Sequence, residues 1–206
     1  MKKIIKISAI CALGMSIPLF AEGLNFAQNG VHNNYLQTSV GVENFKTLGK
    51  NENFVNLKYF NTKINSVIDV TVSDPYKNFS IETILPSVSN FQNGNTYIFS
   101  YTLGIGFLQH DSRSKVNEQK TIQSQKAPYL TPGVQGSIVL HNGVILTAAA
   151  KFKIPLDRSD MTGAYSVSTG IHYQRWNLTA QYDQFHFSGV KNQEDVSVRF
   201  GYSFAF

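Results

Sequence analysis

Apolar and polar residues alternate along most of the chain after Asn34, and the last eleven residues show the pattern most clearly. From Val196 to Phe206 every second residue is apolar, while the residues between them are small or polar. A period of two places the two sets on opposite faces of a β-strand. A strand with one strongly apolar face and one polar face separates lipid from a hydrogen-bonded lumen. This final segment therefore predicts a membrane-spanning β-strand.

Similar alternation recurs with turn residues between the segments, and no convincing helical period interrupts it. The segment 97–107 is the clearest internal strand, since ten steps of about 3.3 Å, tilted by about 40°, rise about 25 Å, the height of a lipid-facing band. Ten strands are favoured, and eight is the main alternative if 67–73 and 79–85 are misassigned. The predicted strands are 35–44, 54–60, 67–73, 79–85, 97–107, 130–140, 144–152, 165–173, 176–182 and 196–206. Pro132 lacks a donor for the ladder, which predicts a position at the rim of the sheet.

The lengths of the links provide a second test, because membrane barrels alternate short periplasmic turns with longer outer loops. Three short links fall on the predicted periplasmic side, at 61–65, 141–143 and 174–175. The predicted outer links are 46–53, 74–78, 109–128, 153–164 and 187–195. The link 86–95 breaks the rule, since it should be periplasmic yet spans ten residues.

The closing Gly-Tyr-Ser-Phe-Ala-Phe resembles the terminal strand of Gram-negative outer-membrane β-barrels. That resemblance implies that the barrel-assembly machinery recognises Tyr202, Phe204 and Phe206 during insertion. In size and strand pattern the chain also resembles the OmpA and OmpX class of small barrels. These resemblances imply an all-β, transmembrane, antiparallel up-and-down β-barrel in the cell outer membrane. Such a barrel contacts outer-membrane lipid and lipopolysaccharide, and a monomer is favoured.

The N-terminus reads as a secretory signal, with Lys2, Lys3 and Lys6 before an apolar run that ends near Ala21. We expect residues 1–21 to be a cleaved signal peptide, 22–33 a periplasmic N-terminal stub, and 34–206 the barrel. Cys11, the only cysteine, leaves with the signal, which excludes disulfides and thiolate chemistry from the mature chain. The whole chain has a net charge of +5, and loss of the three lysines leaves 15 basic against 13 acidic residues, or +2. This small charge excludes a nucleic-acid partner.

Charged residues at lumen-facing positions predict a network of ion pairs inside the barrel. The predicted set is Glu43, Lys58, Asp69, Glu82, Lys151, His172, Asp183 and Arg199, in which four acids oppose three bases and a histidine. Unpaired charge is costly in a narrow lumen, so mixed signs favour a lumen closed by ion pairs. A pore that selects ions of one sign would instead carry one sign of charge.

The longest link, 109–128, is polar throughout, and its basic residues Arg113, Lys115, Lys120 and Lys126 outnumber the acids. Contact with anionic lipopolysaccharide or an extracellular ligand is one interpretation. A solvated loop without such a partner is the other, and it is favoured.

One motif could carry catalysis: residues 185–189, Phe-His-Phe-Ser-Gly, resemble the His-x-Ser-Asn signature of PagL-type lipid A deacylases. The resemblance implies His186 as base and Ser188 as nucleophile, with Glu194 as the candidate acid. Gly189 replaces the asparagine of that signature, and Glu194 and Asp195 come earlier than the family's acid. No metal-ligand cluster or cofactor motif is present in the sequence, so no metal or cofactor is expected.

The sequence therefore favours a non-catalytic outer-membrane β-barrel protein with a role in envelope integrity or surface interaction. Two alternatives stay open: a narrow pore or transporter for small solutes, and a hydrolase similar to the lipid A deacylases.

Overall fold

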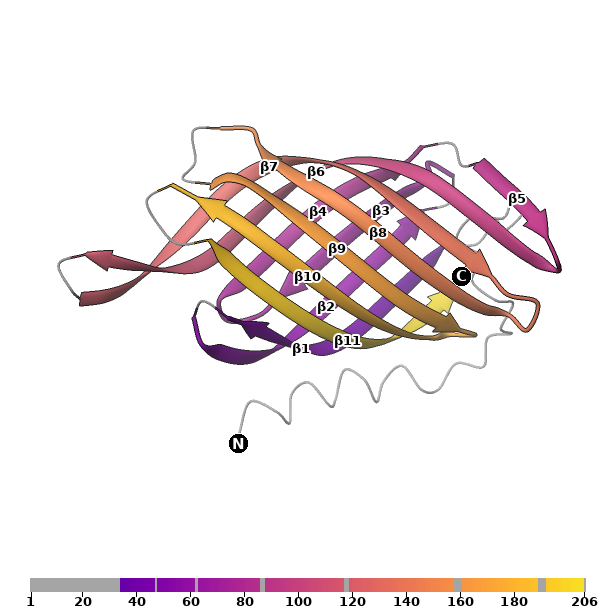
Figure 1. Cartoon of the computed structure of the whole chain (residues 1–206), viewed down its shortest axis with the longest axis horizontal. Helices are drawn as coiled ribbons and strands as arrows, with labels where there is room; N and C mark the ends of the chain where they lie inside the picture. The colour runs from indigo at the N-terminus through magenta and orange to yellow at the C-terminus, as the bar shows by residue number, and fades with distance from the viewer. Residues whose placement is uncertain are drawn as a thin grey trace.

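The computed structural model describes residues 34–46, 48–61, 63–85, 88–116, 119–157, 161–188 and 192–205. These residues form a single antiparallel sheet that closes into a barrel (Figure 1). Its strands are β1 (Tyr35–Phe45), β2 (Lys50–Asn61), β3 (Ser66–Val72), β4 (Tyr76–Ile84), β5 (Val88–Gln92), β6 (Asn95–Val116), β7 (Gln119–Val139), β8 (Val144–Pro155), β9 (Met161–Tyr173), β10 (Trp176–Phe187) and β11 (Gln193–Ala205). Within these residues there is no helix with the length and apolar character needed to cross a membrane.

The barrel closes because its first and last strands pair along their whole length. Tyr35 of β1 lies opposite Ala205 of β11, and Phe45 lies opposite Asp195 at the other end of this seam. We call the end with Tyr35 and Ala205 the terminal end. The other end, with Phe45 and Asp195, is called the hairpin end after the long β6–β7 hairpin that projects from it. Elsewhere each strand pairs with its neighbours in the sequence, as an up-and-down barrel requires, except that β4 pairs with β6 and not with β5.

Strands β4 and β5 act as one interrupted barrel strand, so the closed barrel has ten strands, as the alternation predicted. Both pair with β6: Ile84 lies opposite Thr102, and Val88 lies opposite Phe99. Four steps along β4 and β5 match three steps along β6, which is the register of a β-bulge.

The hairpin between β5 and β6 then turns at Asn93 and Gly94, which have φ angles of 53° and 77°. An Asn-Gly pair with two positive φ values is the preferred two-residue turn of a hairpin. The prediction of a ten-residue link at 86–95 was therefore wrong. Residues 88–92 of that stretch form β5, and this end of the barrel keeps the tight turn that the length rule requires.

The two faces of the strands have opposite character, as the alternation predicted. On β6, Leu103 is 45% exposed on the outside, whereas its neighbour Thr102 is 4% exposed on the inside. Large outward-facing hydrophobic side chains occur on strands all round the barrel, among them Val42, Leu57, Ile81, Ile105, Phe152, Ile171, Leu178 and Phe200. A continuous apolar exterior of this kind is much larger than the exposed patches of soluble monomers and fits a lipid environment.

Strands β6 and β7 are longer than predicted and project beyond the barrel at the hairpin end (Figure 1). The pairing of β6 with β4 ends at His110, and that of β7 with β8 ends at Tyr129. Beyond those residues the two strands pair only with each other, as far as Val116 opposite Gln119. The prediction of a loop at 109–128 was therefore wrong, since most of this segment is a β-ribbon.

The predicted rim position of Pro132 was also wrong, because β7 begins at Gln119 and Pro132 lies well inside the strand, opposite Leu103 of β6. On its other side the β7–β8 ladder skips two residues, resuming with Gly133 opposite Lys151 after Leu130 opposite Ile154. A missing backbone donor is tolerated at such a break in the ladder.

Candidate functional site

The lumen of the barrel contains a central layer of ion pairs. Lys58 Nζ of β2 lies 3.1 Å from Asp69 Oδ2 of β3, and Lys151 of β8 contacts Glu82 of β4. Nearer the hairpin end, Lys153 Nζ lies 3.2 Å from Asp183 Oδ1. Lys58 and Asp69 lie opposite each other on adjacent strands, whereas the pair of Lys151 and Glu82 joins β8 to β4 across the lumen.

Hydrogen bonds hold the third of these pairs in place. Asp183 accepts a hydrogen bond from Ser166 and another from Gln181 Nε2 at 2.6 Å. Gln181 in turn accepts a hydrogen bond from Arg199 Nη2 through its Oε1 atom, at 2.9 Å. Buried charges need such additional partners, because attraction between the ions does not by itself offset their lost hydration.

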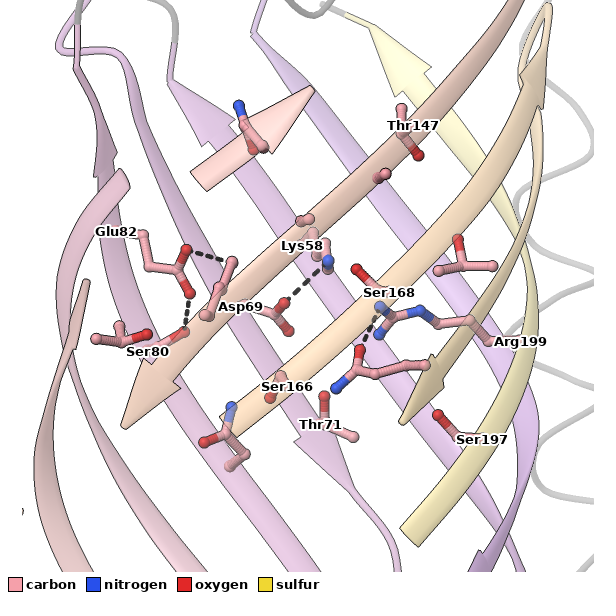
Figure 2. Close-up of a pocket in the computed structure, with 18 of the residues that line it drawn as sticks. Lys58, Asp69, Thr71, Ser80, Glu82, Thr147, Ser166, Ser168, Ser197 and Arg199 are labelled. Carbon is pink, nitrogen blue, oxygen red and sulfur yellow. Dashed lines mark hydrogen bonds and ion pairs between the residues drawn. The ribbon is translucent and has the colours of Figure 1, made fainter. Parts of the chain in front are cut away.

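Between the ion pairs lies a cavity of about 180 Å³. In Figure 2 Asp69 and Glu82 lie on one side of the cavity, while Arg199 enters from the other side, near Ser168 and Ser197. Thr147 and Thr179 add further hydroxyl groups to the lining. The cavity lining thus combines charged groups and hydroxyl groups with a few apolar side chains such as Phe54 and Ala148.

The structure brings some of the predicted network residues together and leaves others apart. Lys58 pairs with Asp69, and Lys151 with Glu82, as described above. Glu43 and Arg199 line the same cavity, but no ion pair within 4 Å involves either residue in the described part of the chain. His172 Nε2 lies 3.4 Å from Thr147 Oγ1.

The sequence reasoning missed Lys153, the partner of Asp183. The Lys153 side chain is 7% exposed. Its Nζ atom lies over the Phe185 ring, 4.8 Å from the ring centroid. The predicted strand ended at Phe152, whereas β8 continues to Pro155. Extending the predicted strand by a single residue beyond Phe152 would have placed Lys153 on the same lumen-facing side as Lys151.

An aromatic plug fills the lumen at the hairpin end, and sequence reasoning missed it as well. Fully buried His110 lies at its centre, with ring centroids 4.8 to 6.0 Å from four aromatic rings. We define the plug as His110 together with the buried apolar cluster of Phe45, Leu48, Tyr76, Leu108, Ala127, Tyr129, Met161, Ala164, Phe185 and Phe187. Close packing of this many large side chains leaves little room for solutes to pass.

Two hydrogen bonds fix the histidine within the plug. Nδ1 lies 2.8 Å from the carbonyl oxygen of Asp111, so Nδ1 carries a proton and donates it, because a carbonyl oxygen only accepts. Nε2 lies 2.6 Å from Asp195 Oδ2 on β11. This second contact ties β6 to β11 across the lumen.

A smaller apolar group lies inside the terminal end of the barrel. The rings of Tyr35 and Phe60 stack with their centroids 5.1 Å apart, and Ile84 packs with them. Ile98 and Ile145 are also buried. The central cavity therefore lies between two apolar regions.

The structure places the predicted catalytic residues on the outer surface without assembling them. His186 is partly exposed on β10, its ring 6.4 Å from that of Tyr165, and Ser188 is exposed just after the strand. Glu194 of β11 forms its ion pair with Lys46, at 3.5 Å. No hydrogen bond among the described residues joins His186 to Ser188 or to Glu194.

Two of the three predicted assembly-signal residues, Tyr202 and Phe204, lie in β11. The centroids of their rings are 4.8 Å apart. Phe206, the predicted signal peptide 1–21 and the stub 22–33 lie outside the described residues. Within the described residues there is no group of three or more histidine, cysteine, aspartate or glutamate side chains that could hold a metal ion.

Taken together, fold and lumen define a closed, ten-stranded antiparallel β-barrel with an apolar exterior and a largely polar central cavity between two apolar regions. No protein-family model matches the chain, and no curated protein matches it. Among solved structures, it is similar to the β-domain of the Bordetella autotransporter Brka, with 10% identity and a TM-score of 0.35 over 84% of this chain and 99% of that one.

Two further solved structures show a comparable likeness. Ail, the attachment invasion locus protein of Yersinia pestis, solved with the heparin analogue sucrose octasulfate, has 11% identity and a TM-score of 0.32 over 84% of this chain and 98% of its own. Neisserial surface protein A has 13% identity and a TM-score of 0.30 over 84% and 97%. At these values the likenesses carry no argument about function.

Proposed function

We propose that this protein is a non-catalytic outer-membrane β-barrel with a closed lumen and a role in envelope integrity or surface interaction. The aromatic plug is the observation that carries this proposal. A protein that conducts solutes needs a continuous wet path, whereas the plug fills the lumen at the hairpin end with buried side chains. The ion pairs then act as structural braces rather than as the lining of a channel.

A position in the outer membrane is supported by the exterior of the barrel. Aromatic residues flank the apolar band on its outer face, with Tyr165 and Tyr182 towards the hairpin end and Tyr173 and Trp176 at the opposite turn. Aromatic girdles at both interfaces are typical of outer-membrane barrels. In this orientation the hairpin end faces the cell exterior, and the β6–β7 ribbon extends towards lipopolysaccharide and extracellular partners.

The proposal about location is tested by fractionating cells that express the full chain and comparing boiled with unboiled samples by gel electrophoresis. We expect the protein in the outer-membrane fraction, with a mobility that changes on boiling because the folded barrel resists detergent. Recovery as soluble protein would contradict the membrane proposal.

The proposal about the lumen is tested by recording the conductance of planar bilayers that contain the refolded wild-type protein. We expect no regular single-channel steps at neutral pH. A matched variant with a smaller plug, Phe185→Ala combined with Phe187→Ala, is expected to produce steps if the plug is what blocks the path. Regular steps from the wild-type protein would refute the closed lumen.

The second candidate function is a narrow pore or transporter for small solutes, and the cavity of about 180 Å³ is the observation that favours it. Solutes would have to pass the plug after a rearrangement of its aromatic rings. Selective conductance by the wild-type protein, with the reversal potential of a salt gradient as the readout, would establish this candidate in place of the first.

A further inference from the structure

Among the described residues that line the cavity, one cation, Arg199, has no direct ion pair with a carboxylate. Of the four lysine and arginine residues that line the cavity, Lys58, Lys151 and Lys153 each have a carboxylate partner. Arg199 has no carboxylate within 4 Å among the described residues, although its side chain lies inside the barrel and the residue is 7% exposed. A buried cation without a counter-ion is costly in a narrow lumen.

The third acid that lines the cavity, Glu43, does not fill this gap. Glu43 of β1 lies opposite Ser197, whereas Arg199 lies opposite Gly41, two residues further along the seam. The Oε2 atom of Glu43 is itself buried without a hydrogen-bond partner. The structure therefore leaves both an acid and a base of the lumen without a direct ionic contact.

The guanidinium of Arg199 is held in place but not neutralised. Its Nη2 atom donates to Gln181 Oε1 at 2.9 Å, and Gln181 is oriented by its own hydrogen bond to Asp183. The amide of Gln181 is neutral, so it fixes the position of the guanidinium without offsetting its charge. The Nε atom of Arg199 is buried and has no hydrogen-bond partner.

The space next to Arg199 suits a small anion. Arg199 reaches into the cavity towards Ser168, and Ser197 lies beside it on the same strand (Figure 2). Serine and threonine hydroxyl groups rotate, so those in the cavity lining can donate to an anion. A cavity of about 180 Å³ has room for an anion of a few atoms together with water.

We propose that the lumen binds a small carboxylate-type anion at Arg199. The planar guanidinium presents parallel N–H donors, which match the two oxygens of a carboxylate better than a spherical ion. The anion would supply an acceptor for Nε and a counter-charge for Arg199, with Gln181 as the positioning residue. This site does not depend on the lumen being closed: a conducting barrel that still bound the anion would refute the closed lumen and leave the site intact.

The test uses nuclear magnetic resonance of the refolded full-length barrel in detergent micelles, with ¹⁵N-labelled arginine and formate as the probe. The sequence has four arginines, and loss of one Nε–H signal in Arg199→Lys assigns the signal of interest. The internal control is Arg175, which lies in the β9–β10 turn and donates a hydrogen bond to the Tyr202 hydroxyl. The protein is refolded at each formate concentration, with sodium chloride keeping the ionic strength constant, so that slow entry does not mask binding.

We expect the Arg199 Nε–H signal to shift with saturation and the Arg175 signal to change little. Half-saturation by formate should come at a concentration roughly tenfold lower than half-saturation by chloride, as one additional charge-assisted hydrogen bond implies. In Glu43→Gln the formate affinity should be retained or increased, because a neighbouring acid competes for the same cation. The proposal is overturned if the wild-type Arg199 signal shows no saturable shift, or if formate and chloride act alike.

Discussion

The ion pair between Lys153 and Asp183 should contribute far more to folding than any pair on the rim of the barrel. Both side chains are almost fully buried, at 7% and 3% exposed, and their charged atoms lie 3.2 Å apart. Lys153 Nζ also lies over the rings of Phe185 and Tyr129, and replacing Lys153 with Met keeps an unbranched side chain there but removes the charge. Asp183 would then be left buried without a counter-ion, which costs about 3 to 5 kcal/mol.

The expected loss lies near the lower end of that range, about 3 kcal/mol, because Asp183 would keep the hydrogen bonds from Ser166 and Gln181. The measurement is reversible urea unfolding of the refolded barrel in lipid vesicles, followed by tryptophan fluorescence of Trp176. The matched control is Lys50→Met at the rim, where Lys50 and Asp74 are 45% and 80% exposed. Exposed pairs contribute only about 0 to 1 kcal/mol.

A double variant separates the unpaired charge from the loss of packing. In Lys153→Met combined with Asp183→Leu, neither ion remains, so stability should recover to within about 1 kcal/mol of the wild type or exceed it. If Lys153→Met and Lys50→Met were equally mild, the lumen would be well hydrated and the description of a buried pair would be wrong. A double variant as unstable as Lys153→Met alone would show that packing, not charge, determines the effect.

Two other predictions test the faces of the barrel. Leu103→Arg on the lipid-facing side should destabilise the folded barrel by about 2 to 4 kcal/mol, whereas Gln135→Arg, at a position that lines the cavity, should destabilise it less. Urea unfolding in lipid vesicles measures both losses, and equal losses would mean that the faces are wrongly assigned. Mass spectrometry of lipid A from cells that express the wild-type protein should show no loss of an acyl chain, because His186, Ser188 and Glu194 do not form a catalytic site. Loss of an acyl chain that disappears in Ser188→Ala would establish the hydrolase instead.

The barrel was predictable from the sequence because lipid and lumen impose opposite demands on neighbouring residues. Leu103 and Thr102 differ in exposure as their chemistry requires. The projecting ribbon of β6 and β7 has no such signature, because its strands extend beyond the pairing with β4 and β8 and so leave the wall that separates lipid from lumen. Apolar and polar residues alternate only where the two faces of a strand lie in different environments. A strand with both faces in the same environment lacks this pattern and is therefore predicted to be a loop.

The plug could not be found by the same reasoning. His110 lies in a segment whose polar character predicts a loop, and in the sequence its partner Asp195 is only a candidate acid near the surface motif. Their contact joins residues 85 positions apart, and no local pattern encodes such a distance. The continuation of β4 into β5 was missed because a bulge shifts the alternation by one residue.

The seam between β1 and β11 also has a consequence for the order in which the barrel can fold. Every other pairing of neighbouring strands can begin from a nearby turn, such as Asn93-Gly94, but Tyr35 and Ala205 must meet across 170 residues of chain. Closing a loop of that length costs about 2.5 kcal/mol more than closing one of ten residues. The hairpins can therefore form early, while the seam is delayed until most of the sheet has assembled. Until it closes, β1 and β11 are open edges, each able to pair with another chain.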